Sequence, residues 1–107
     1  MTFYNTIGLD RQALLKAGMT TLNQNQKILR YFIQQGNDYQ AAPSAICEKV
    51  FGDAIPVTSV RRAMTTLTTD GHLEKSPVTV VGPYGKPEHL WQLAPRWRGE
   101  MEQGSLL

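Results

Sequence analysis

Two adjacent arginines, Arg61 and Arg62, stand among the hydroxyl side chains of Thr58, Ser59 and Thr65. Guanidinium and hydroxyl groups are the side chains that most often hydrogen-bond DNA phosphates and base edges. Arginine can also bind guanine through two parallel hydrogen bonds, worth about 1 to 3 kcal/mol of discrimination against another base. These five residues are therefore candidates for contact with a nucleic acid.

Helical spacing would place these groups on one face. Val60 is followed by apolar residues three, four and seven positions later, which predicts a helix over 58–69 with a buried stripe. No acidic residue interrupts the opposite face before Asp70. The positive end of the helix dipole at Thr58 and Ser59 would favour an approaching phosphate. The residues expected on the outer face are Thr58, Ser59, Arg61, Arg62, Thr65, Thr66 and Thr69.

A second candidate contact lies in the loop over 82–87, where Lys86 is the single cation. Gly82 and Gly85 would let this loop approach a sugar-phosphate backbone closely, and Tyr84 could lie against a sugar or a base. Glu88 offsets part of the positive charge of the loop.

Other chemistry finds little support in the residue pattern. Cys47, His72 and His89 have no short metal-ligand spacing and no fourth candidate ligand. Cys47 is expected on the apolar face of a helix, and no carboxylate pair or Ser-His-Asp order is present. We therefore expect a protein that is not an enzyme and needs no metal or cofactor.

Several further elements would position these groups. Asp10 can cap a short helix over 11–17, and Asn23 with Gln26 forms a capping-box pattern for a helix that ends at Gly36 and spans residues 21–35. In that helix Arg30 is expected to face water. Pro43 can open a helix that runs to Phe51 and stops at Gly52. We expect an extended arm over 1–8.

After Gly71 the helical period ends. A β-branched run over 78–81 and a strand over 90–93 flank the loop rich in glycine and proline, which predicts a β-hairpin. Leu90, Trp91 and Leu93 are expected to pack in the core and at its edge, and Trp97 is the strong candidate to pack back from a tail over 95–107.

Three helices followed by a hairpin is the order of a winged helix-turn-helix, an α+β fold with a three-helix core, a β-hairpin wing and, here, a short extra N-terminal helix. SVRRAMTTLTTDGHLEK resembles the recognition helix and first wing strand of bacterial winged-helix transcription regulators, with Val60, Arg61, Ala63, Met64 and Leu67 at matching positions. GPYGKPEHLWQL is similar to their wings. Together with the N-terminal YNT, these segments resemble small winged-helix proteins encoded in bacterial prophages and other mobile elements.

The bulk composition is compatible with that resemblance. The chain has 107 residues, a net charge of +2 and one cysteine, so we expect a single domain that uses a local basic patch and has no internal disulfide. The expected organisation is an arm and short helix over 1–20, the winged-helix domain over 21–94 and the tail over 95–107. With no signal-peptide pattern or membrane span apparent, we expect a cytoplasmic protein.

Three functions remain open, and the least favoured of them, binding to structured RNA or to single strands, would call for more exposed aromatic residues than Tyr84 alone. The first is duplex DNA binding, sequence-specific or general, by a small transcriptional regulator of phage or mobile-element origin, acting as a homodimer on paired half-sites. The second is a protein-interaction winged helix in a replication or packaging assembly, which the near-neutral charge fits.

Overall fold

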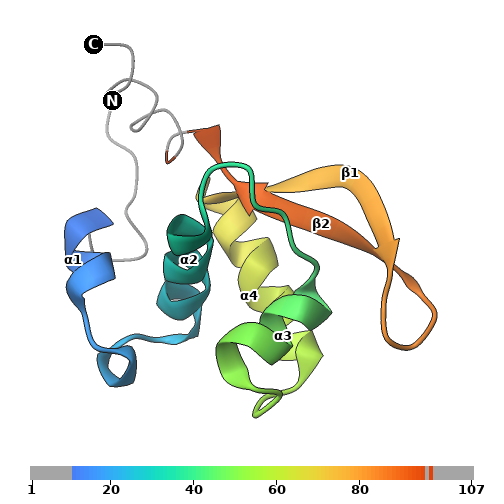
Figure 1. Cartoon of the computed structure of the whole chain (residues 1–107), viewed down its shortest axis with the longest axis horizontal. Coiled ribbons are helices and arrows are strands. Elements are labelled where there is room, and N and C mark those ends of the chain that lie inside the picture. The colour runs from blue at the N-terminus through green and yellow to red at the C-terminus, as the bar shows by residue number, and fades with distance from the viewer. Residues whose placement is uncertain (1–10, 96, 98–107) are drawn as a thin grey trace.

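The computed structural model describes residues 11–95 and residue 97. The expected arm over 1–8, the Asp10 cap and most of the expected tail lie outside the described residues. Helices α1 to α4 gather on one side, and the two strands extend away from them to a loop at the far end (Figure 1). The elements are α1 (Arg11–Lys16), the 3-10 turn η1 (Met19–Thr21), α2 (Gln24–Gln35), α3 (Pro43–Phe51), α4 (Val57–Thr69), β1 (Leu73–Val81) and β2 (Pro87–Leu93).

Helix α2 begins at Gln24, directly after the predicted Asn23 cap. The helix predicted from the apolar pattern over 21–35 was therefore three residues too long at its N-terminus. The Asn23 side chain accepts from the Gln26 backbone N–H, and the Gln26 side chain accepts from the Asn23 N–H, both at 2.8 Å. Thr21 belongs to η1 instead, because its backbone N–H and its hydroxyl both donate to the Gly18 carbonyl. The buried face of α2 is the predicted one, with Ile28, Leu29, Phe32 and Ile33 in the core.

Long-range hydrogen bonds attach α1 and the end of the described chain to this core. Arg30 was expected to face water, but its guanidinium donates to the Ala17 carbonyl at the end of α1 and is partly buried. Arg11 donates to the Trp97 carbonyl at 3.2 Å. The Trp97 indole N–H donates to Nδ1 of the buried His72, also at 3.2 Å, so Trp97 packs back as predicted.

Helices α3 and α4 form the helix-turn-helix. Helix α3 ends at Gly52, whose φ of 58° is the left-handed conformation that a C-terminal glycine adopts readily. Helix α4 starts at Val57, one residue before the predicted start. Its buried face consists of the predicted residues Val60, Ala63, Met64 and Leu67.

The wing consists of β1, β2 and their connecting loop (residues 73–93). The strands are antiparallel, from Leu73 opposite Leu93 to Val81 opposite Pro87, and the pairing is irregular between Lys75 and Thr79. Both strands are longer than the predicted runs over 78–81 and 90–93. Trp91 also exchanges backbone hydrogen bonds with Ala41 on the other edge of β2. The predicted α+β winged-helix architecture is confirmed.

An aromatic cluster fixes the connection between α2 and α3. The hydroxyls of Tyr31 and Tyr39 are 3.0 Å apart, and both rings pack edge-on against Phe32. Burial and the hydrogen bond to Tyr31 raise the pKa of Tyr39 to about 12. The folded state therefore holds the Tyr39 proton more tightly than the unfolded chain, whose tyrosines titrate near pH 10.

This difference predicts a loss of stability in alkaline solution. The contribution of the Tyr39 proton is complete below about pH 10 and is lost as the pH rises through about 12. Urea titrations at pH 8 and at about pH 11 should show a smaller drop in unfolding free energy for Tyr39→Phe than for the wild type. An equal drop in both proteins would show that Tyr39 titrates alike in both states.

Candidate nucleic-acid interface

The outer face of α4 presents most of the predicted contact residues to solvent. Thr58, Arg62 and Thr65 follow one another at spacings of four and three residues, so they line one stripe of the helix. All three are exposed, as is Arg61 beside them, whereas Ser59 is half-buried. The Thr65 hydroxyl donates to the Arg61 carbonyl at 3.0 Å and keeps its lone pairs for an incoming donor.

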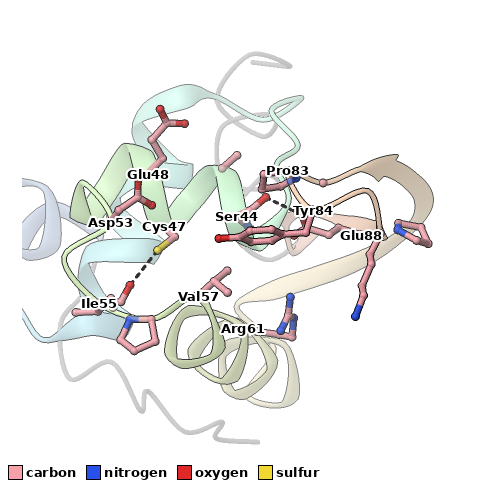
Figure 2. Close-up of a pocket in the computed structure, with 15 residues that line it drawn as sticks. Ser44, Cys47, Glu48, Asp53, Ile55, Val57, Arg61, Pro83, Tyr84 and Glu88 are labelled. Atoms are coloured by element: carbon pink, nitrogen blue, oxygen red, sulfur yellow. Dashed lines mark hydrogen bonds between the residues drawn. The ribbon is translucent and has the colours of Figure 1, made fainter.

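The wing loop comes close to this helix across a cleft of about 920 Å³. Arg61 of α4 and Tyr84 and Lys86 of the loop all line it, so three predicted contact residues from distant parts of the sequence meet here. Figure 2 shows the Tyr84 ring lying across the cleft, with Arg61 on the α4 side. Thr58, Ser59, Arg62 and Thr65 lie outside the cleft lining.

Opposite charges occupy different parts of the cleft wall. Glu48 and Asp53 lie at the C-terminal end of α3 and in the turn that follows, away from Arg61 in Figure 2. Lys86 belongs to the wing side. Glu88, the third acidic residue of the lining, is held at Ser44 of α3, so an anion would be attracted to Arg61 and Lys86 and repelled by the α3 side.

The cations on that side are available for a ligand. Within the described part of the chain, the side chains of Arg61, Arg62 and Lys86 make no hydrogen bond or ion pair. The residue before α4 is Pro56, and no described side chain caps the first turn of the helix. The first half of α4 thus combines the open backbone N–H groups of Val57 and Thr58 with Arg61 and Arg62, and the wing loop adds Lys86.

The orientation of the wing is fixed by Glu88, a role that the sequence analysis missed. The Glu88 carboxylate accepts from the Ser44 backbone N–H at 3.2 Å and from the Ser44 hydroxyl at 2.7 Å. Helix α3 needs this partner because its own N-cap residue, Ala42, has no side-chain hydrogen bond. An alanine before a helix that starts at Pro43 was the available sequence signal, but the partner is 44 residues away.

Gly82 makes this contact sterically feasible, which gives a stability prediction. A Cβ at Gly82 would collide with the Glu88 carboxylate. We expect Gly82→Ala to displace Glu88 from Ser44 and lower the unfolding free energy by about 0.5 to 2 kcal/mol, the usual value of a helix cap. In a Glu88→Ala background the same change should have almost no effect on urea unfolding, and equal effects in both backgrounds would contradict the proposed collision.

The Thr68 hydroxyl joins α4 to the wing, as Ser44 joins α3 to it. It accepts from the Trp91 indole N–H at 2.8 Å and donates to the Met64 carbonyl at 2.7 Å. Thr68 therefore has a structural role, unlike the exposed Thr65, Thr66 and Thr69. The predicted packing of Trp91 into the core is confirmed.

Cys47 is placed where a structural thiol is expected. It is buried, and its thiol donates to the Ile55 carbonyl at 3.2 Å. Burial, and then the neighbouring Asp53 carboxylate, raise the pKa of the thiol, so it stays protonated and weakly nucleophilic at neutral pH. Among the described residues no group of three or more His, Cys, Asp or Glu side chains could hold a metal ion.

The fold of this chain resembles that of a known protein. Among solved structures it is similar to one described as a possible transcriptional regulator from Methanosarcina mazei Go1, with a TM-score of 0.52 over 89% of this chain and 75% of that chain. The two sequences are 12% identical, so the likeness concerns the fold. No protein-family model and no curated protein matches the chain. No helix in residues 11–95 is long and apolar enough to cross a membrane.

Proposed function

We propose that this protein binds duplex DNA through the outer face of α4 and the tip of the wing. The observation that carries the proposal is the group of exposed cations, Arg61, Arg62 and Lys86, that have no partner within the described residues. A solvated arginine on a helix usually has no special role. Here both arginines stand on the exposed face of the second helix of a helix-turn-helix, next to a wing that carries the third cation.

Each element has a distinct part in this proposal. Arg61, Arg62, Thr58, Ser59 and Thr65 contact base edges and phosphates in the major groove. Lys86 and Tyr84 contact the flanking sugar-phosphate backbone. The acidic Glu48 and Asp53 keep the backbone away from the α3 side of the cleft. The negative partner is thereby guided to one side of the cleft.

The biological role follows from the resemblance noted in the sequence. We propose a small cytoplasmic transcriptional regulator of phage or mobile-element origin that acts without a cofactor and catalyses no reaction. The wing and recognition-helix patterns support it, and the description of the M. mazei protein as a possible transcriptional regulator is compatible with it. Binding to paired half-sites would require two copies of the chain.

The salt dependence of DNA binding tests this proposal. Three cations that neutralise phosphates should make affinity fall roughly 40-fold between about 50 and 200 mM salt, from a slope of about −0.9 per phosphate. Fluorescence anisotropy of labelled random-sequence duplex measures this directly. Lack of binding at about 50 mM salt would refute general DNA association.

One observation favours a second function, protein interaction. The wing exposes Val78, Val80 and Val81, an unusual amount of apolar surface for an element that contacts DNA alone. In a protein-interaction winged helix of a replication or packaging assembly, this surface would dock another protein. Such an interface should lose little affinity over the same change in salt.

A further inference from the structure

The outer part of β1 exposes three aliphatic side chains. Val78, Val80 and Val81 are 50%, 40% and 75% exposed, and Tyr84 in the adjoining loop is 86% exposed. The other large hydrophobic side chains whose exposure is described are buried or half-buried. Because side chains alternate along a strand, Val80 and Val81 lie on opposite faces of β1, so exposed apolar side chains flank this part of the strand on both faces.

The backbone of β1 is also open along one edge. Strand β2 is paired on both sides, with β1 and with Ala41, whereas β1 has β2 as its only strand neighbour in the described residues. Natural sheets protect such an edge with charges, irregular pairing or proline. Pro77 and the irregularity between Lys75 and Thr79 protect the part of β1 nearer the helices. Residues 79–81 carry no such protection.

The charge of this segment decides between partners. Residues 76–85 contain no charged side chain, so a charged partner would lose hydration there without gaining an ion pair. A second uncharged strand meets this edge without such a loss. The same strand of a second copy satisfies this requirement, and antiparallel pairing about a twofold axis makes the surface complementary to itself.

We propose that the outer edge of β1 pairs with β1 of a second copy of this chain, giving a homodimer joined wing to wing through Val78, Val80 and Val81. The contact is compatible with an occupied cleft, because the wing residues that line the cleft come from the loop and β2 and none comes from β1. The inference does not depend on DNA binding.

The size of the surface sets the expected affinity. A short strand edge and three valines per chain bury less surface area than the roughly 800 Å² per partner that a standard stable interface buries. We therefore expect a dissociation constant on the order of 10 to 100 µM. Dimerisation should be visible at high protein concentration and on DNA that holds two copies side by side.

Analytical ultracentrifugation of the full chain from about 1 µM to about 1 mM tests the proposal. The variant Val78→Lys/Val81→Lys places like charges on both copies at the pairing edge. Its matched control, Gln12→Lys/Gln34→Lys, adds the same charge at exposed positions on α1 and α2. We expect the wild type and the control to dimerise with similar constants and the valine variant to associate at least 10-fold more weakly.

Hydrogen exchange of the wild type gives a readout that needs no variant. Amides of residues 79–81 should exchange more slowly as the concentration rises through the dimerisation midpoint. A wild type that stays monomeric throughout, or a valine variant that dimerises like the control, would overturn the proposal. Protection of 79–81 that is already complete in the monomer would assign the edge to a segment of the same chain and would overturn it as well.

Discussion

Replacing both Arg61 and Arg62 with alanine is expected to weaken duplex DNA binding about 100-fold at low salt, since two phosphate contacts and the counterions that they release are lost. The variant should also lose most of its salt dependence. With Lys86 as the remaining cation of the three, affinity should fall roughly 4-fold between about 50 and 200 mM salt, against roughly 40-fold for the wild type. Anisotropy titrations at both salt concentrations measure the two effects.

Controls separate local contact from overall charge. Lys16→Ala/Lys27→Ala removes the same charge from α1 and α2, and it should bind DNA nearly as well as the wild type. Both arginines are exposed, so circular dichroism should show the arginine variant folded. Equal losses in the two double variants would mean that net charge, and not the face of α4, determines binding.

A lysine version tests what the guanidinium groups add. Arg61→Lys/Arg62→Lys keeps both charges but cannot form the paired hydrogen bonds to guanine. It should retain the salt dependence of the wild type and lose its preference between duplex sequences. A preserved preference would show that the arginines contact phosphates alone.

Trp91→Ala is expected to lower the unfolding free energy by about 3 to 5 kcal/mol, the usual loss for a large aromatic removed from a core. Trp91 is 5% exposed and joins three parts of the fold. Its backbone pairs with Ala41, its indole N–H donates to Thr68, and Lys75 lies over its ring at 5.5 Å from the centroid. The unfolding free energy of a small domain is roughly 5 to 15 kcal/mol in total. The Trp91→Ala variant should therefore be partly unfolded at 37 °C.

A double-mutant cycle isolates the hydrogen bond from the packing. Trp91→Phe and Thr68→Val each remove one partner of the 2.8 Å hydrogen bond. The loss of unfolding free energy in the double variant should be smaller, by about 1 kcal/mol, than the sum of the losses in the two single variants. Urea unfolding measures all four proteins. A Trp91→Ala variant within about 1 kcal/mol of the wild type would refute the structural role assigned to this residue.

Features that depend on near neighbours in the sequence could be predicted. The Asn23 and Gln26 capping box involves residues three positions apart, and the buried face of α4 repeats within its own 13 residues. The exposed positions of Arg61 and Arg62 follow from the same helical period. Local spacing was sufficient for these features.

Features that depend on distant neighbours could not be predicted. The residues next to Glu88 in the sequence give no sign that its carboxylate caps the helix starting at Pro43. The residues next to Arg30 likewise give no sign that its guanidinium donates to the Ala17 carbonyl. The meeting of Arg61 with Lys86 and Tyr84 in one cleft also requires the fold itself. Strand β1 was predicted too short because Pro77 and the irregular pairing beside it interrupt the alternation that marks a strand.

Amide chemical-shift mapping of the labelled protein, titrated with a short duplex at about 50 mM salt, tests the proposed interface most directly. The largest shifts should fall on residues 58–66 of α4 and 82–86 of the wing loop, and α1 and the buried face of α2 should be unaffected. Shifts confined to β1, or to the helices far from α4, would contradict an interface formed by α4 and the wing loop.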